Sequence, residues 1–329
     1  MKKSFLILLV LSLVLAACGG SAEEETVEET AVVEEAETLD SPATTVAETL
    51  DKITFGFIPS AEQADLQDNI KPLMKVLSDG LGIEVEGFVT SDFSGLLVAM
   101  GSGQADIGAF NTLGYVNALN VFPTRIEAIA KVVRYGSGSY HGNFWTTDAS
   151  VCDSPPVIGA FENIDGVPTL IKGSATAPPD VKALQVGWAF GDNGLEPEVR
   201  DGVTVSPGYA CEADLSVMIG NEVLFVEEGS TSGYLYPSLQ LKNLGIDYTS
   251  DITQVFAGSH DGVISGLYNG DAKFGVTYDD ARRTLRKTNP DVGEKVIAIG
   301  ITAEIPNDVV AVRSDLPEEI KGKIYQILS

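Results

Sequence analysis

The chain has 329 residues, of which 44% are hydrophobic and 21% are charged, a balance typical of a folded protein with a packed core. Acidic residues outnumber basic ones 47 to 21, and the net charge of −26 argues against nucleic acid or an anionic membrane surface as a partner. With two histidines, three cysteines and no CxxC spacing, we expect neither a metal site nor a cofactor.

The first 17 residues are predicted to be a signal peptide that is removed from the mature protein. Lys2 and Lys3 precede an apolar run, residues 5–14, which is too short to span a membrane. The run leads into residues 15–20 (LAACGG), which resemble the lipobox of bacterial lipoproteins. That resemblance implies cleavage before Cys18 and a lipid on Cys18 that anchors the exported protein in the bacterial cell envelope. The alternative is an ordinary signal peptide with a cysteine there by chance.

Residues 18–51 are predicted to form an acidic tether between the lipid and the folded body. The segment from Ala22 to Asp51 contains eleven acidic residues and no basic or aromatic residue. Like charges without a sustained apolar face favour a solvated coil over a packed helix. A cation-binding tail is the alternative. The chain from Lys52 onward keeps 19 basic and 36 acidic residues, a net charge of −17.

From residue 52 the sequence alternates predicted strands with predicted helices, the pattern of an α/β protein. The first helix covers 62–79, where apolar residues recur with helical spacing. Ser91 or Asp92 is expected to begin the next helix, and Thr112 the one after it. Strands joined by helices are expected to pair in parallel, with ligands bound beyond their carboxyl ends. The strand-forming runs in this half are 52–59, 83–89, 105–110 and 126–134.

Residues 148–214 interrupt this alternation and are interpreted as an insertion. The segment is rich in proline, glycine and aspartate, with a short predicted strand at 183–188. It carries Cys152 and Cys211, which we expect to form a disulfide in an exported protein whose Cys18 is lipidated. Two reduced cysteines are the alternative.

The alternation then resumes and places polar residues at three successive helix starts, each just after a predicted strand. The first, residues 229–233 (GSTSG), brings three hydroxyls and free backbone N–H groups to a helix start, which favours an anion. It lacks the Gly-Lys-Ser/Thr element of a nucleotide-binding loop, and a plain serine N-cap is the alternative. The second contains His260 and the third contains Tyr278, Asp279 and Asp280, which in isolation are typical of structural residues. The strand-forming runs here are 222–227, 254–257, 272–277, 296–299 and 309–313. A last helix is predicted to begin at 320, and the given sequence is expected to stop within that helix.

Taken together, these motifs resemble the substrate-binding proteins of ABC transporters for phosphonate, phosphite and phosphate. The likeness covers about residues 52–140 and 222–313. It is carried by residues 229–237 (GSTSGYLYP), 256–261 (FAGSHD), 55–60 (FGFIPS), 106–108 (DIG) and 113–115 (LGY).

The resemblance implies a two-lobed, α/β type II periplasmic-binding-protein fold whose hinged cleft closes on a ligand. The first lobe would comprise 52–137 and 274–329 and the second 138–273, with hinges near 135–140 and 274–278. The implied function is capture of phosphonate, phosphite or phosphate outside the cytoplasm and delivery to a membrane permease, without catalysis. A monomer is expected.

The resemblance also implies which residues bind the ligand. Relatives hold the phosphorus-bound oxygens with residues that match Ser230, Thr231, Ser232 and His260. Tyr278 and Asp279 match a pair that approaches the ligand, with Asp280 as the alternative to Asp279. An ionised carboxylate can only accept a hydrogen bond, so this aspartate would suit a protonated P–OH. The first lobe is expected to contribute Phe93, where relatives often have tyrosine, together with Asn111 and Thr112.

Two other classes of function remain as alternatives. A secreted hydrolase would use Ser230 or Ser232 with His260 and Asp279, although the sequence has no Gly-x-Ser-x-Gly turn after a strand. A ligand-sensing ectodomain would share the two-lobed fold, although no predicted membrane helix follows the lipobox.

Overall fold

The structure is a computed structural model that describes residues 50–61, 63–134, 137–172, 198–200 and 203–329. The predicted signal peptide, Cys18, most of the acidic tether and the predicted strand at 183–188 lie outside the described residues. Within these ranges, no helix is both long enough and apolar enough to cross a membrane.

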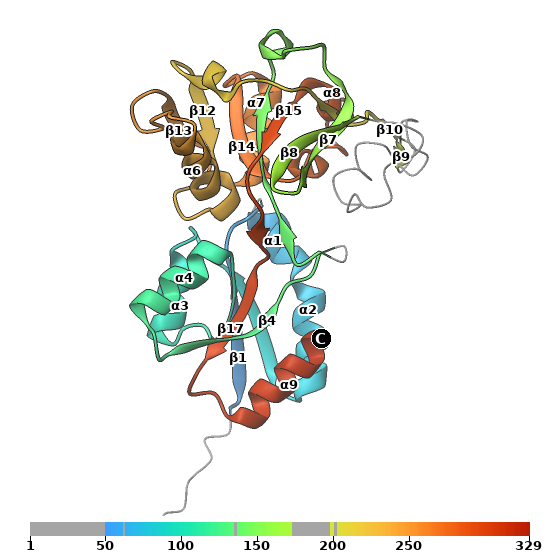
Figure 1. Ribbon diagram of the computed structural model, residues 1–329. Coiled ribbons are helices and arrows are strands. Elements are labelled where there is room, and N and C mark those ends of the chain that lie inside the picture. Colours follow the sequence, from blue (N-terminus) through green and yellow to red (C-terminus); the bar gives the residue numbers. More distant parts are fainter. Residues whose placement is uncertain (1–49, 62, 135–136, 173–197, 201–202) are drawn as a thin grey trace, which may run out of the picture. The chain divides into compact units, whose positions relative to one another are not determined.

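The smaller of the two main sheets has five strands in the order β2-β1-β3-β17-β4 (Figure 1). Its strands are β1 (Lys52–Phe57), β2 (Glu84–Val89), β3 (Ile107–Phe110), β4 (Ile126–Lys131) and β17 (Val309–Arg313). Strand β1 pairs in parallel with β2 and β3, as expected for strands joined by helices. Strand β17 instead runs antiparallel between β3 and β4, so the expectation of parallel pairing is wrong there. The cause is chain order, because β17 enters from the larger sheet and not through a helical crossover from β3.

In the described part of the chain, five helices accompany the smaller sheet. They are α1 (Gln63–Asn69), α2 (Lys71–Leu81), α3 (Gly95–Ser102), α4 (Thr112–Val121) and α9 (Glu318–Leu328). The helix expected over 62–79 is two helices, and Pro72 stands in the first turn of the second, where its missing N–H costs little. Helix α2 ends at Gly82, whose φ of 69° is a left-handed conformation that glycine adopts freely.

The larger sheet has eight strands in the order β13-β12-β14-β6-β15-β11-β7-β8 (Figure 1). Its strands are β6 (Gly142–Thr146), β7 (Val157–Ile164), β8 (Val167–Lys172), β11 (Tyr209–Ala210), β12 (Glu222–Phe225), β13 (Thr253–Phe256), β14 (Phe274–Tyr278) and β15 (Ile297–Ile301). The sequence-based expectation assigns residues 274–329 to the first lobe. In the structure, β14 and β15 instead belong to the larger sheet, because both pair with β6. Their apolar side chains, such as Phe274 and Ile299, lie in the same core as Phe144 of β6.

Over the residues that the structure describes, the chain passes between the two sheets twice, after β4 and after β15. In these connections β5 (Ser139–Tyr140) pairs antiparallel with β16 (Ile305–Pro306). Asn307 adds a hydrogen bond from its Nδ2 to the Ser137 carbonyl at 2.8 Å, and Arg134 pairs with Asp308 at 2.6 Å. The first connection coincides with the hinge expected near 135–140, of which 135 and 136 are not described. The second connection is 302–308, whereas the hinge expected near 274–278 falls within β14.

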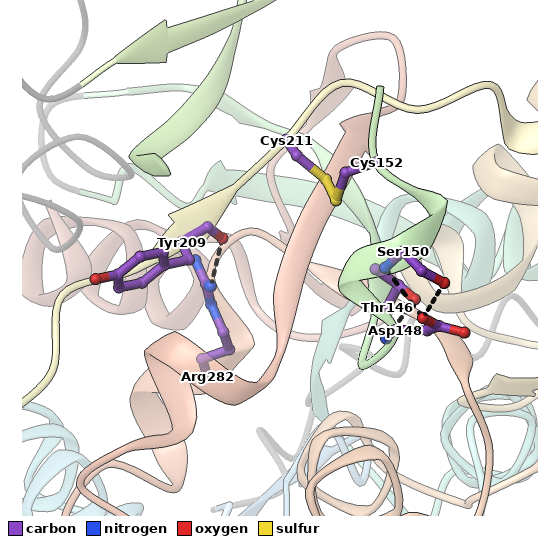
Figure 2. The surroundings of a disulfide bond; sticks show 7 residues. All are labelled: Thr146, Asp148, Ser150, Cys152, Tyr209, Cys211 and Arg282. Atoms are coloured by element: carbon purple, nitrogen blue, oxygen red, sulfur yellow. Dashed lines mark hydrogen bonds between the residues drawn. A yellow bond between two sulfur atoms is a disulfide. The ribbon is translucent and has the colours of Figure 1, made fainter. Parts of the chain in front are cut away.

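The insertion extends one edge of the larger sheet. Strands β7 and β8 form a hairpin that joins the sheet through β11, and β9 (Glu198–Arg200) pairs with β10 (Val203–Val205) in a separate ribbon. The expected disulfide between Cys152 and Cys211 is present, with the two Cα atoms 5.7 Å apart, and it joins the turn η1 (Ala149–Val151) to β11 (Figure 2). Asp148 caps η1 by accepting a hydrogen bond from the Ser150 N–H.

A buried cation ties this edge of the larger sheet to the segment after β14. Arg282, in the turn η4 (Ala281–Thr284), is fully buried and donates from Nη1 to the Tyr209 carbonyl at 3.0 Å (Figure 2). Its guanidinium lies 4.6 Å from the ring centre of Trp145, whose Nε1 donates to the Thr277 hydroxyl at 2.7 Å. These contacts hold the end of β14 in place, next to Tyr278.

Candidate functional site

The Ser-Thr-Ser loop after β12 lies at the start of a helix, as expected. Ser230, Thr231 and Ser232, here called the hydroxyl loop, begin the single turn η3 (Thr231–Leu235), which continues into α6 (Tyr236–Asn243). All three are at most 2% exposed. Ser230 is the N-cap, since its Oγ accepts a hydrogen bond from the Gly233 N–H at 3.0 Å. A capping serine keeps its own hydrogen to donate, so the capping role and an anion-binding role are compatible.

Helix α4 of the smaller sheet contacts the hydroxyl loop directly. The Leu113 N–H donates to Oγ1 of Thr231 at 3.0 Å, and Asn111 Nδ2 donates to the carbonyl of Gly229 at 2.9 Å. Asn111 also caps α4, because its Oδ1 accepts from the Gly114 N–H at 2.6 Å. The structure therefore brings Asn111 to the loop. Thr112, expected beside it in the site, donates instead to the Pro306 carbonyl of β16 at 2.6 Å.

Phe93 forms a second contact between the two sheets and is only 4% exposed. Its N–H donates to Oε1 of Glu227 at 3.0 Å. A Cβ atom on Gly229 would lie 2.6 Å from the Phe93 Cβ, so this approach requires a glycine. Burial raises the pKa of Glu227, while the hydrogen bond from Phe93 opposes that rise. The sequence did not point to Glu227 as a site residue, because it follows the apolar core residues of β12.

His260 begins α7 (His260–Asn269) and is 4% exposed. Its Nδ1 accepts the N–H of Tyr278 at 3.2 Å, and the two rings meet edge to face at 4.6 Å. Burial, with a smaller contribution from the nearby Arg134 charge, lowers the pKa of His260 to about 3. The imidazole is therefore neutral near pH 7 with its proton on Nε2, which leaves Nε2 as a donor.

The structure separates the roles of Asp279 and Asp280. The Asp280 carboxylate binds Arg282 with both oxygens, Oδ2 at 2.6 Å from Nη2 and Oδ1 at 3.0 Å from Nε. Asp279 is 5% exposed and lies with Oδ2 3.4 Å from Nδ1 of His141. Burial raises the pKa of Asp279, while His141 favours its ionised form. Burial also raises the pKa of Tyr278 to about 12, so its hydroxyl stays protonated.

Sequence reasoning missed Tyr140 and His141, which precede β6. Burial raises the pKa of Tyr140 above its usual range, while a side-chain hydrogen bond with Ser232 opposes that rise. Gly142 approaches the same loop, since a Cβ there would lie 2.8 Å from the Ser232 carbonyl oxygen. The one available sequence signal was that His141 is one of two histidines in the chain.

A cavity of about 580 Å³ lies elsewhere, at the C-terminal end of α3, and none of the predicted site residues line it. The two arginines on its wall have partners, since Arg125 donates to the Gly101 carbonyl and Arg313 pairs with Asp106. Across the described part of the chain, no three His, Cys, Asp or Glu side chains are grouped to hold a metal ion.

The arrangement is suited to holding an anion with neutral donors. The hydroxyls of Ser230 and Thr231 each accept a backbone N–H and keep a hydrogen to donate, and His260 presents Nε2–H. Hydrogen bonds to a charged acceptor are about twice as strong as neutral ones, and more so in a buried site. A Ser-His-Asp hydrolase needs Nδ1–H of its histidine to donate to the aspartate, whereas Nδ1 of His260 is an acceptor here.

Comparison with known proteins agrees with this fold. Residues 55–329 match the family model described as ABC transporter, phosphonate, periplasmic substrate-binding protein. The phosphate-import protein PhnD of Mycolicibacterium smegmatis is 25% identical over 263 residues, which cover 78% of this chain and 63% of that relative's length.

Two solved structures share the fold. PhnD1 from Prochlorococcus marinus in complex with methylphosphonate has a TM-score of 0.59 at 17% identity, with 85% of this chain and 84% of that chain covered. A binding protein component of an ABC phosphonate transporter from Pseudomonas aeruginosa has a TM-score of 0.58 at 16% identity, with 84% and 74% covered. Since the family model spans more than four fifths of the sequence, the chain belongs to the family of periplasmic substrate-binding proteins of phosphonate ABC transporters, which bind a substrate for transport and are not enzymes.

Proposed function

We propose that this protein captures a small phosphorus oxyanion outside the cytoplasm and delivers it to the membrane permease of an ABC importer. The ligand class comprises phosphonate, phosphite and phosphate. Family membership supports the importer role. The ligand class is supported by one relative named for phosphate import and by a structural relative that is a methylphosphonate complex.

The observation that carries the proposal is the set of buried donors around the hydroxyl loop. Ser230 and Thr231 are oriented by backbone N–H groups, so their hydroxyl hydrogens are free to point at a ligand. Neutral His260, at the start of the next helix, would add a third donor from Nε2, and its ring is held by the Tyr278 N–H. Because these donors are uncharged, the site holds an anion in a protein of net charge −26 without needing a cationic side chain.

Capture requires that the two lobes close over the ligand. We assign the smaller sheet with α1–α4 and α9 to one lobe and the larger sheet with the insertion to the other. Phe93, Asn111 and Leu113 of the first lobe donate to Glu227, Gly229 and Thr231 of the second, which is the set of contacts expected of a closed form. Closure excludes water and strengthens each hydrogen bond to the anion. The paired strands β5 and β16 serve as the hinge.

The N-terminal segment supplies the location. A lipid on Cys18 would hold the protein at the outer face of a bacterial membrane, and the acidic tether would let the folded body reach the permease. Mass spectrometry of the membrane fraction tests this, since a diacylglyceryl Cys18 at the N-terminus is expected and an N-terminus elsewhere would refute it.

Isothermal titration calorimetry with phosphate, phosphite and methylphosphonate tests the ligand class. At least one of them is expected to bind, and Ser230→Ala combined with Thr231→Val is expected to weaken that binding about 10- to 100-fold through the loss of two donors to a charged ligand.

Thr169→Val is the matched control, because its hydroxyl donates within the insertion hairpin, to the Val167 carbonyl. It should bind like the unchanged protein. Absence of binding by all three anions would refute the proposal, as would full affinity in the double variant.

A further inference from the structure

Thr112 begins α4 beside the hydroxyl loop, but its own hydroxyl bonds to the hinge. Oγ1 donates to the Pro306 carbonyl at 2.6 Å, across 194 positions of the chain. Pro306 belongs to β16, which pairs with β5 in the connection between the lobes. A hydroxyl has a single hydrogen, so Thr112 has none left to donate to an anion. The ligand contact expected from the sequence therefore does not account for this residue.

The residues on either side of Thr112 bond to the other lobe. Asn111 Nδ2 donates to the Gly229 carbonyl at 2.9 Å, and the Leu113 N–H donates to Oγ1 of Thr231 at 3.0 Å. Three consecutive residues at one helix start thus reach the hinge once and the second lobe twice. The start of α4 is the place where the hinge and the anion site are joined.

The first turn of α4 is held in one conformation. Oδ1 of Asn111 accepts the Gly114 N–H at 2.6 Å, and the Asn111 carbonyl accepts the Tyr115 N–H at 3.0 Å. A side-chain cap of this kind fixes the geometry of a helix start. Residues 111–113 therefore move together, and a shift of Thr112 relative to β16 moves both donors that reach the second lobe.

Thr231 links this helix start to the ligand. Leu113 lies in the first turn of α4, where backbone N–H groups have no partner within the helix. Its N–H donates to Oγ1 of Thr231, which leaves the hydroxyl hydrogen to point at an anion. Hydrogen bonds in a chain polarise one another, so the positive end of α4 strengthens the Thr231 donor. Thr112 can thus affect the anion through Leu113 and Thr231 without touching it.

The hinge reaches the hydroxyl loop from the second lobe as well. Tyr140 of β5 pairs with Ile305 of β16, the residue before Pro306. The Tyr140 side chain has a hydrogen bond with Ser232 of the loop. The hydroxyl loop is therefore held from both lobes by contacts that lead back to the same pair of hinge strands.

We propose that Thr112 is a positioning residue for capture, which fixes the start of α4 against β16 so that closure brings the Leu113 N–H to Thr231. This inference rests on the proposed function. Without the hydrogen bond to β16, the helix start can settle at other distances from the hinge, and fewer molecules reach the closed form with the donors in place. Ligand affinity falls with the population of the binding-competent state.

Calorimetry of the full chain with phosphate, phosphite and methylphosphonate tests this role. Thr112→Val keeps the shape of the side chain and removes its hydroxyl, so affinity should fall about 3- to 10-fold. The factor should be the same for each anion that binds, because Thr112 does not touch the ligand. Thr112→Ser keeps the hydroxyl and should restore most of the affinity. A changed preference among the anions, or no rescue by serine, would refute the positioning role.

A double-mutant cycle tests whether Thr112 acts through Leu113. In a Thr231→Val background the Leu113 N–H has lost its acceptor, so adding Thr112→Val should cost less affinity than it does in the unchanged protein. A general loss of stability would lower affinity equally in both backgrounds, and that result would overturn the proposed path.

Ser314→Ala is the matched control. The Ser314 hydroxyl also donates to a distant backbone carbonyl of the smaller lobe, that of Thr124 at 2.7 Å, but it follows the end of β17 that is remote from β16. Its loss should leave ligand affinity unchanged. If the unchanged protein binds none of the three anions, the proposed function itself fails. If it binds them and Thr112→Val binds them as tightly, the proposed function stands and the role of Thr112 is refuted.

Discussion

The backbone N–H of Tyr278 donates to Nδ1 of His260 at 3.2 Å, and this single contact determines which nitrogen of the imidazole can serve a ligand. An imidazole that accepts at Nδ1 carries its proton on Nε2. The contact joins the end of β14 to the start of α7, so the donor is oriented by two elements of one lobe before any ligand arrives.

His260 makes the folded protein sensitive to acid. Its pKa falls from 6.5 in the unfolded chain to about 3 in the folded protein, so its stabilising contribution is complete above pH 6.5 and is lost as the pH falls toward 3. The expected loss is about 1.4 kcal/mol per pH unit within that window. Urea unfolding at pH 7 and pH 5 should therefore show that the unchanged protein loses about 2 kcal/mol more than His260→Asn.

The comparison with His260→Asn isolates one group. Burial raises the pKa values of Asp279 and Asp308, which changes stability with pH in the opposite direction, but both aspartates are present in both proteins. Equal pH dependence of the two proteins would show that His260 is not held neutral by burial.

Asn111 combines two roles that substitutions can separate. Its Oδ1 caps α4, and its Nδ2 donates across to Gly229 of the other lobe. Asn111→Ser keeps a capping oxygen but removes the Nδ2 that donates to Gly229, so ligand affinity should fall about tenfold with little change in the free energy of unfolding. Asn111→Ala loses both, so its stability should fall by a further ~1 kcal/mol. Calorimetry and urea unfolding measure the two effects, and equal stability of the two variants would contradict the capping role.

Much of the local structure could be predicted from the sequence. The strand expected over 52–59 is β1 (Lys52–Phe57), and the hydroxyl loop begins a helix as its Gly-Ser-Thr-Ser-Gly pattern indicates. These features depend on residues close together in the chain, where alternation, capping and glycine act directly.

Sheet membership could not be predicted in the same way. The apolar run of β14 does not indicate by itself that β6 is its partner, and Phe274 of β14 shares a core with Phe144 of β6 only in the folded chain. The contact of Leu113 with Thr231 joins residues 118 positions apart. His141 carried no local pattern, because its partner Asp279 is brought to it by that same strand pairing.

The disulfide should stabilise the larger lobe without affecting the site. Cys152 and Cys211 are 59 positions apart, and closing a loop of that length in the unfolded chain is worth about 4 kcal/mol in the chain-entropy treatment, with smaller gains often measured. Replacing both with alanine should lower the free energy of unfolding by about 2–4 kcal/mol. Methylphosphonate affinity should stay the same, because the bridge joins η1 to β11 at the insertion edge. A loss of affinity in a folded variant would show that the insertion supports the cleft.

Gly229 should control closure, because it lies where the two lobes are in contact. An added Cβ would be 2.6 Å from the Cβ of Phe93, an atom that cannot move without its backbone. Gly229→Ala should therefore disfavour the closed form and weaken ligand binding by about tenfold or more, since affinity falls with the population of the binding-competent state. Small-angle scattering at saturating ligand should show less compaction than in the unchanged protein. Gly322→Ala is the matched control, because a Cβ there meets no atom within 4 Å. In a Phe93→Gly background the clashing atom is gone, so the further loss caused by Gly229→Ala should shrink, and an undiminished loss would mean that the contact with Phe93 is not the cause.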